Sequence, residues 1–153
     1  MGDRRHIKLW AFLTPFLVLL GLALYDYGSA YWQQHKLGEA AFEGAKWAKA
    51  HGYDAGKITT IAQSATDLTG IAVTPYRPCG CAAGAAITQA QCNASCSGGG
   101  WSQPYIVVTT SMCYGTVLAW PGVPYCSSGN SQCAATGCTP KQIVLTSQSV
   151  ALQ

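Results

Sequence analysis

LWAFLTPFLVLLGLALY, residues 9–25, decides the architecture of this chain, because it is a continuous apolar run without a charged side chain. A helix needs roughly 17 to 25 such residues to cross the apolar core of a bilayer. Arg4, Arg5 and Lys8 precede the run, and Asp26 is the first charge after it. Because basic flanking residues stay on the cytoplasmic side, we expect a transmembrane segment with a cytoplasmic N-terminus.

A cleaved secretory signal is the alternative interpretation of this N-terminus. The small residues Gly28, Ser29 and Ala30 would suit a signal peptidase that cleaves after Ala30. The run is, however, slightly longer than the roughly 7 to 15 residues of a secretory apolar core. Aromatic residues of the kind that settle at membrane interfaces follow it and favour a retained anchor: Tyr25, Tyr27, Tyr31 and Trp32.

Eight cysteines lie in the second half of the chain, and an even number in a loop-rich exported region predicts a disulfide framework. Disulfides form in oxidising compartments, so the cysteines and the flanking charges independently place this half outside the cytoplasm. The sequence leaves the pairing open. The cysteines are Cys79, Cys81, Cys92, Cys96, Cys113, Cys126, Cys133 and Cys138.

The cysteine spacing does not favour a metal centre. No Cys-x-x-Cys is present and no His follows His51, whereas zinc knuckles and c-type haem sites need those residues. Cys79 and Cys81, in a Cys-Gly-Cys, leave a thiol oxidoreductase as a further interpretation. Only Arg77 is close enough in sequence to lower a thiol pKa there.

The C-terminal half is also poor in residues that perform catalysis. After Asp67 there is no Asp, Glu or His, and only Arg77 and Lys141 carry charge. General acid–base catalysis relies on such side chains. No basic stripe interleaved with aromatic residues follows the anchor. We therefore expect no enzyme activity, no cofactor, no metal and no nucleic-acid partner.

Helical periodicity continues past the apolar run to about residue 50. Small or apolar residues recur there at spacings of three or four and predict a packing stripe: Leu37, Ala40 or Ala41, Gly44 and Ala48. Within the apolar half, Pro15 predicts a local kink. Gly21 and Gly28 lie one heptad apart and are candidates for a helix–helix contact.

A second, shorter helix is expected after a break at residues 51–56, with Gly70 placed to end it. Residues 105–114 and 143–152 are rich in Val, Ile, Thr and Tyr, which predicts strands of a small antiparallel sheet. The cysteines are expected in the loops between the strands.

The predicted fold class is therefore α+β. A long N-terminal membrane-spanning helix continues into a soluble helix, followed by a second short helix and a small antiparallel sheet in a disulfide-rich head. The expected parts are a basic N-terminus at 1–8, a transmembrane segment at 9–25, a helical stalk at 26–73 and a cysteine-rich β head at 74–153.

Several segments resemble the TadE-like pilus assembly proteins. In that family an apolar segment with a proline leads into an acidic-aromatic-Gly step and then an Ala-Ala-x-x-Gly-Ala-(Arg/Lys)-aromatic-Ala stretch. The resemblance covers residues 4–73 and 105–152, where two strand-like segments are similar to the paired strands that close such heads. The segments are LWAFLTPFLVLLG at 9–21, YDYGSAY at 25–31, AAFEGAKWA at 40–48, YIVVTT at 105–110 and IVLTSQSVA at 143–151.

The resemblance implies a minor pilin or pseudopilin of the tight-adherence (Flp, type IVc) pilus. Such a protein sits in a bacterial inner membrane with its head in the periplasm, or is incorporated in a surface pilus. The implied partners are the inner membrane, other pilin helices and the Tad secretion machinery. The helix-packing role falls on the Pro15 to Gly28 face and on the stripe from Leu37 to Ala48.

One departure from the family pattern concerns processing. Processed members carry a Gly before the cleavage point and a Glu five residues into the mature chain. Aligned on Pro15, that Glu position is Leu9, and the residue five beyond Gly2 is Ile7. An anchored, unprocessed assembly factor is therefore expected alongside an incorporated subunit.

A function of another class is also open, namely a secreted or membrane-anchored disulfide-rich binding module, such as an adhesin or carbohydrate-binding head. Aromatic side chains suit such surfaces, although they pack equally well in cores and sheets. The candidates are Trp101, Trp120, Tyr105, Tyr114 and Tyr125.

Overall fold

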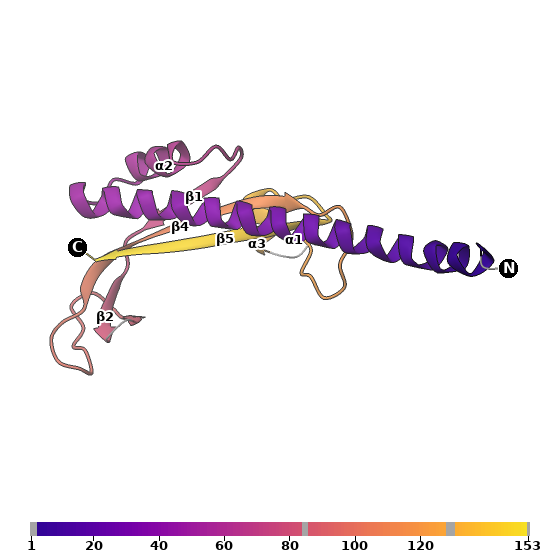
Figure 1. Cartoon of the computed structure of the whole chain (residues 1–153). Coiled ribbons are helices and arrows are strands. Elements are labelled where there is room, and N and C mark those ends of the chain that lie inside the picture. The colour runs from indigo at the N-terminus through magenta and orange to yellow at the C-terminus, as the bar shows by residue number, and fades with distance from the viewer. Residues whose placement is uncertain (1–2, 84–85, 128–130, 153) are drawn as a thin grey trace.

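The computed structural model describes residues 3–83, 86–127 and 131–152, and its dominant element is the helix α1 (Asp3–His51). This helix is continuous over 49 residues, and Pro15 lies inside it without ending it. At about 1.5 Å per residue it is roughly 70 Å long, whereas the apolar core of a bilayer is about 30 Å thick. Figure 1 shows that the N-terminal half projects from the rest of the molecule, while the C-terminal half lies along a sheet.

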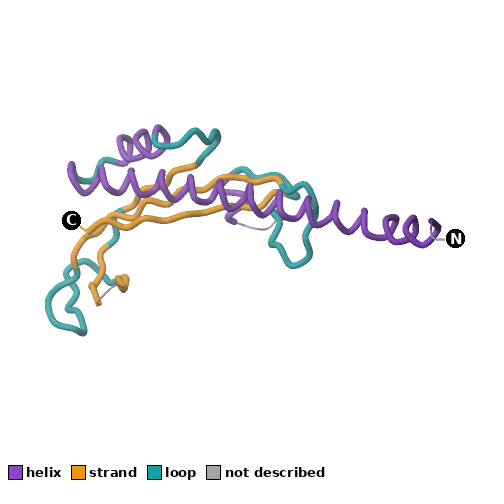
Figure 2. Tube along the Cα trace, in the orientation of Figure 1, coloured by secondary structure: helices purple, strands orange, loops and turns teal. Residues whose placement is uncertain are grey.

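The sheet is built around one central strand, β4 (Gln103–Gly115). On one side β4 pairs antiparallel with β5 (Gln142–Leu152), from Tyr105 opposite Leu152 to Gly115 opposite Gln142. On its other side it pairs with β1 (Ala72–Tyr76). The strands run lengthwise beside α1, as Figure 2 shows. The predicted strands at 105–114 and 143–152 are confirmed as partners.

A small hairpin extends the sheet at the far end of β4. Strand β2 (Cys79–Ala83) pairs with β3 (Ala86–Gln89) and with the first residues of β4, where Cys79 lies opposite Pro104. Sequence reasoning missed β1, β2 and β3, and it missed the short helix α3 (Ser131–Thr136). Strand β1 contains a proline, and β2 consists of Cys, Gly and Ala, so their composition carries a weak strand signal.

Two groups of buried side chains join α1 to the sheet. In the first, Ala41, Ala45 and Ala48 of α1 contact Ile106 and Val108 of β4. The second contains Leu37 and Ala40 of α1, and its other members are Ile71, Tyr114 and Leu145. Alanine and glycine on the helix let it approach the sheet closely, so a small head obtains a core from one face of α1.

The second helix differs from its predicted extent. Helix α2 (Ala55–Ser64) begins after Asp54, whose carboxylate accepts a hydrogen bond from the Lys57 N–H at 3.1 Å. It ends with Ala65 as its C-cap, before the expected stop at Gly70, which lies in the loop beyond it with φ +75°. In this loop Asp67 pairs with Lys36 of α1 at 3.0 Å. The apolar periodicity predicted that the helix continues to Gly70. Contacts with α1 hold the residues after Ala65 in a loop instead.

All eight cysteines form disulfides, as predicted, and the structure resolves the pairing. Cys79–Cys92 and Cys81–Cys96 tie the loop after β3 to β2. Cys113–Cys138 ties the segment after α3 to the end of β4. Cys126–Cys133 ties α3 to the loop that precedes it. The expectation that the cysteines lie in loops is wrong for Cys79, Cys81 and Cys113, which are in strands, and for Cys133, which is in α3. The bridges thus act on the two parts of the head that pack least against α1.

Candidate functional site

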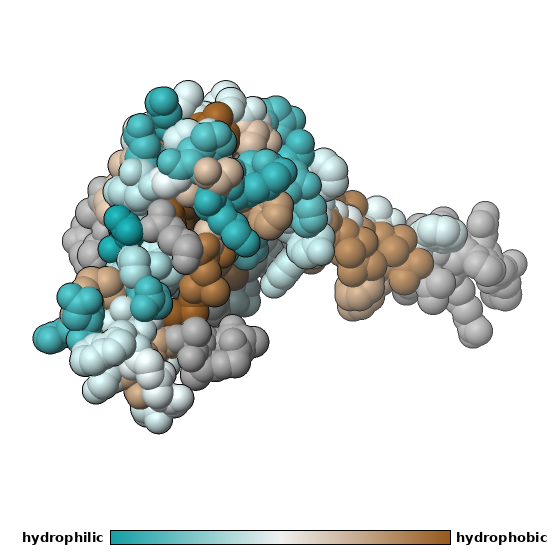
Figure 3. Space-filling model, turned by 90° about the vertical axis from the view of Figure 1, so that its left-hand side faces the viewer, coloured by the Kyte–Doolittle hydropathy of each residue, from teal (hydrophilic) through white to brown (hydrophobic). Residues whose placement is uncertain are grey.

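Between Trp10 and Leu20, helix α1 presents apolar side chains on all its sides. Every residue from Trp10 to Leu20 is exposed, and Phe12 is 86% exposed. Figure 3 shows these apolar residues in brown where α1 projects from the head. Within the described part of the chain, one helix is long and apolar enough to cross a membrane, and it lies near the N-terminus. The chain therefore fits a single-pass membrane protein.

The predicted helix-contact residues Gly21 and Gly28 lie beside open space. No heavy atom outside the local helix stands within 4 Å of the position that a Cβ would take at either residue. Pro15 is also on this half of α1. At 3.6 residues per turn, Gly21 and Gly28 lie about 140° and 160° from Asp26 in the same direction around the helix, and Asp26 faces the head. The two glycines therefore share a face that the protein's own head leaves uncovered.

The predicted stripe on the C-terminal half of α1 has a different environment. Leu37, Ala41 and Ala48 are fully buried. A Cβ at Gly44 would lie 3.2 Å from the Ala62 Cβ of α2 and 3.4 Å from a methyl group of Val108. The stripe therefore packs inside the chain, against α2 and the sheet.

Asp26 connects the exposed apolar half of α1 to the head. Its carboxylate accepts hydrogen bonds from the backbone N–H of Val117 at 3.0 Å, from that of Leu118 at 3.2 Å, and from the indole Nε1 of Trp120 at 2.9 Å. The side chain is buried, with 2% of its surface exposed. We call these four residues the Asp26 junction, and the segment 116–125 that holds three of them the junction loop.

Two tyrosines complete the contacts around the Asp26 junction. The Tyr125 hydroxyl accepts a hydrogen bond from the main-chain N–H of Trp120 at 2.7 Å and donates one to the main-chain carbonyl of Leu118 at 3.1 Å. These two hydrogen bonds close the junction loop on itself. The Tyr114 hydroxyl donates to the main-chain carbonyl of Asp26 at 3.2 Å and also hydrogen-bonds Ser29. One turn of α1 is therefore tied to the end of β4 and to the loop that follows it.

These donors also change the acidity of Asp26. The Val117 N–H lowers the pKa of Asp26 most, and burial opposes that effect by disfavouring the charged carboxylate. The Trp120 indole and the Leu118 N–H lower the pKa further, so that it lies below its ordinary value. Hydrogen bonds to the ionised form therefore outweigh desolvation, and the carboxylate stays charged at neutral pH.

Sequence reasoning used Asp26 as the charge that marks the end of the span and as the acid of the acidic-aromatic-Gly step, and missed its role in the junction. One available signal was that Asp26 is the only acidic residue between Asp3 and Glu39. An acid placed alone after an apolar helix needs hydrogen-bond donors if it is buried. Its donors come from the other end of the chain, and no local pattern indicates them.

The three topology residues stay a prediction. Arg4, Arg5 and Lys8 belong to the first turns of α1, and their side chains lie outside the described part of the structure. Met1 and Gly2 also lie outside it.

The structure does not assemble the aromatic surface expected of a binding module. Tyr105 and Tyr114 are buried, and Trp120 and Tyr125 are half-buried in the contacts described above. Trp101 is the exposed member of the five, with 66% of its surface accessible. Four of the five rings therefore serve packing and hydrogen bonding within the head.

Cys79 and Cys81 do not form a thiol-exchange pair with each other, because each is bridged to a different cysteine. Among the residues that the structure describes, no group of three or more His, Cys, Asp or Glu side chains is placed to hold a metal ion.

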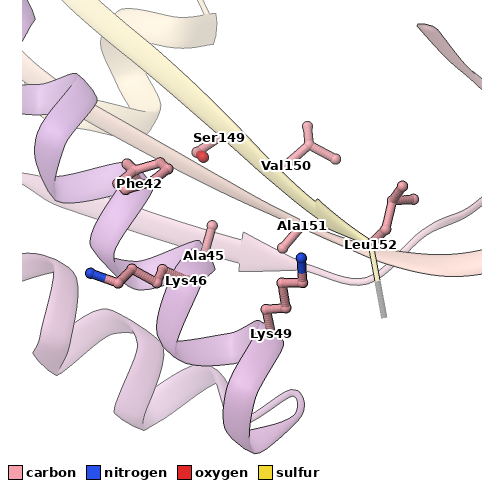
Figure 4. A pocket seen from close by; sticks show the side chains of 8 residues that line it. All are labelled: Phe42, Ala45, Lys46, Lys49, Ser149, Val150, Ala151 and Leu152. Atoms are coloured by element: carbon pink, nitrogen blue, oxygen red, sulfur yellow. The ribbon is translucent and has the colours of Figure 1, made fainter. Parts of the chain in front are cut away.

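A groove of about 400 Å³ lies between the end of α1 and the end of β5. Figure 4 shows Lys46 and Lys49 on its helix side and Val150 and Leu152 on its strand side. Lys46 is already paired with Glu43 at 3.1 Å. The described residues that line the groove carry no carboxylate and no imidazole side chain.

A comparison with protein families gives one match, to a model described as TadE-like protein, over residues 10–46. The matched segment contains the exposed apolar half of α1, Asp26 and most of the buried stripe. The resemblance predicted from the sequence is confirmed over this segment. No curated protein and no solved structure matches the chain.

Proposed function

We propose that the protein is a minor pilin or pseudopilin that takes part in assembly of a tight-adherence pilus. The proposal starts from the match to the TadE-like family model over residues 10–46. The observation that carries this proposal is the match itself. The matched segment lies on α1, where one half of the helix is exposed and apolar and the other half packs against the head. An apolar helix carrying a folded head suits a subunit that is held in a membrane and packs side by side with similar helices.

The proposed orientation places the N-terminus in the cytoplasm and the head in the periplasm of a single-pass inner-membrane protein. Arg4, Arg5 and Lys8 before the apolar run support it through the positive-inside rule. The four disulfides support it because such bridges persist in an oxidising compartment. Alkaline phosphatase fused after the last residue is expected to be active, and inactivity there would contradict the orientation.

The contact surface that we propose for neighbouring pilin helices is the open face of α1 with Gly21 and Gly28. Small residues in membrane helices let two backbones approach, and this gains van der Waals contact that lipid does not replace. The stripe from Leu37 to Ala48 is already occupied within the chain. A neighbour is therefore expected on the side of α1 away from the Asp26 junction.

The test replaces a glycine on the open face in a host that carries the Tad machinery. Gly21→Leu is expected to reduce surface pili, counted by electron microscopy, while the amount of protein in the inner membrane stays unchanged. Leu19→Phe is the matched control, because it enlarges an exposed side chain about 200° around the helix from Gly21. Equal pilus counts for Gly21→Leu and the unsubstituted protein would contradict the proposed face.

A further inference from the structure

The junction loop presents apolar residues at the surface of the head. Its central part is VLAWPGVP, residues 117–124, and no Asp, Glu, Lys or Arg occurs anywhere between Arg77 and Lys141. Val117 is 58% exposed, and Pro121 and Pro124 are exposed as well. Exposed apolar segments that are held together in one place often mark an interaction site.

The position of this loop is set by the Asp26 junction. Asp26 is the first residue after the apolar run, and its carboxylate holds the Val117 and Leu118 backbone and the Trp120 ring. The Tyr27 and Trp120 rings lie 6.3 Å apart. The exposed apolar loop is therefore fixed beside the turn of α1 where the helix leaves the membrane.

The surroundings of the loop continue the apolar surface of the helix. An apolar crevice of about 70 Å³ lies between Tyr27 and Ala30 of α1 and Trp120 and Val123 of the loop. Tyr25, Tyr27 and Tyr31 are each exposed on the same part of α1. In Figure 1 the orange loop projects beside α1 at the end of the head that is nearer the N-terminus.

We propose that residues 117–124 insert into the interface of the bilayer leaflet that faces the head, so that the protein contacts the membrane through both α1 and the junction loop. The occupant of this surface is phospholipid, because the loop lacks charge and is continuous with the exposed apolar surface of the spanning helix. Tryptophan and tyrosine favour the headgroup region, and interfacial segments bury their apolar residues about 5–10 Å into it.

A second contact has a consequence that one helix alone does not provide. A single spanning helix is free to rotate about its axis and to tilt, and interfacial anchors restrict both motions. With the junction loop in the interface, Asp26 would hold the head at one rotation relative to the membrane. The face with Gly21 and Gly28 would then point in one direction within the bilayer.

The inference relies on α1 crossing the membrane, and the experiment separates the two claims. The full-length protein is placed in nanodiscs of phosphatidylethanolamine and phosphatidylglycerol, with the photo-crosslinker p-benzoylphenylalanine in place of Val117, Phe16 or Val150. Phe16 lies in the apolar run and reports membrane insertion. Val150 is 51% exposed on β5 and is the matched control for an exposed valine of the head. Intact mass spectrometry then counts lipid adducts after irradiation.

The expected result is a lipid adduct at positions 16 and 117, with at least a several-fold lower yield at position 150. An adduct at 16 with equal, low yields at 117 and 150 would overturn the inference and leave the anchor intact. A protein adduct at 117 in place of a lipid adduct would also overturn it, by showing that another chain occupies the loop. Absence of an adduct at 16 would overturn both claims.

A second variant tests whether the Asp26 junction positions the loop. Asp26→Asn removes the charge that holds the Val117 and Leu118 N–H groups and the Trp120 indole. Combined with the crosslinker at 117, it is expected to lower the lipid adduct yield several-fold, while the yield at 16 stays unchanged. An unchanged yield at 117 would contradict the positioning role of Asp26. The intact mass also reports whether the four disulfides remain, because each bridge removes two hydrogens.

Discussion

Asp26 and Trp120 are 94 residues apart in the sequence, and the Trp120 indole donates a hydrogen bond to the Asp26 carboxylate at 2.9 Å. The same carboxylate holds the backbone of Val117 and Leu118. A charged group next to the apolar run of α1 thus binds the loop between β4 and Cys126. This contact connects the exposed apolar half of α1 with the folded head.

Asp26→Asn is expected to loosen the junction loop, because an amide has one acceptor oxygen in place of two and carries no charge for the three donors. Hydrogen exchange of the Val117 and Leu118 amides should speed up at least tenfold, and the thermal midpoint of the detergent-solubilised protein should fall. Glu39→Gln is the matched control, since Glu39 is exposed and its carboxylate pairs with the exposed His35 at 3.5 Å. Equal exchange in the two variants would contradict the role of Asp26.

Acid should weaken the same junction. The pKa of Asp26 is lower in the folded protein than its ordinary value, so the stability that the carboxylate contributes is complete above the ordinary pKa. It is lost as the pH falls through the folded pKa, that is, below about pH 4. Unfolding midpoints measured between pH 7 and pH 3 should therefore fall more steeply for the unsubstituted protein than for Asp26→Asn. Parallel curves would show that other groups cause the acid sensitivity.

Thr110→Val tests a buried contact between the sheet and α1. The Thr110 side chain is fully buried, and its hydroxyl donates to the Leu37 carbonyl of α1 at 2.9 Å. Valine keeps the shape and removes this hydrogen bond, so unfolding is expected to become easier by about 1 kcal/mol. The neighbouring Thr109→Val, on the opposite face of β4, should change stability by less than about 0.5 kcal/mol. Denaturant titration measures the free energy of unfolding of both variants, and equal values would contradict the contribution of the Thr110 hydrogen bond.

Gly80→Ala is expected to disturb the hairpin of β2 and β3. A Cβ at this position would lie 2.7 Å from a methyl group of Ile87 and 2.8 Å from both the Thr88 carbonyl oxygen and the Tyr105 ring. Overpacking of this kind costs about 1 to 3 kcal/mol. Gly98→Ala is the control, because nothing lies within 4 Å of its Cβ position. The measurement is the free energy of unfolding, and equal values for the two variants would contradict the close contact.

The two disulfides near α3 should differ in their contribution to stability. Cys113–Cys138 closes a separation of 25 residues, and Cys126–Cys133 closes one of 7. Restriction of the unfolded chain predicts about 3.5 kcal/mol for the longer loop and about 2.4 kcal/mol for the shorter one. Paired Cys→Ser substitutions of each bridge, followed by denaturant unfolding, would test this order. A larger loss for the shorter loop would indicate that local packing dominates.

Much of the candidate site could be predicted because its signals are local. The apolar run before Asp26 and the small residues at Gly21 and Gly28 are properties of adjacent positions on one helix. The strands β4 and β5 carry residues whose shape suits a sheet over their whole length. By contrast, β2 gains its strand conformation from pairing with β3 and β4 and from two bridges, so its Cys-Gly-Cys composition predicted a loop.

The sequence by itself determined the apolar helix, the even set of cysteines and the two long strands, because each depends on the composition or period of a continuous segment. Only the tertiary structure decided which cysteines pair and that the stripe from Leu37 to Ala48 packs inside the chain. It also decided that the Asp26 carboxylate accepts hydrogen bonds from Val117, Leu118 and Trp120. These contacts join positions far apart in the chain. Their geometry follows from packing the whole head against one face of α1, and no local pattern contains that information.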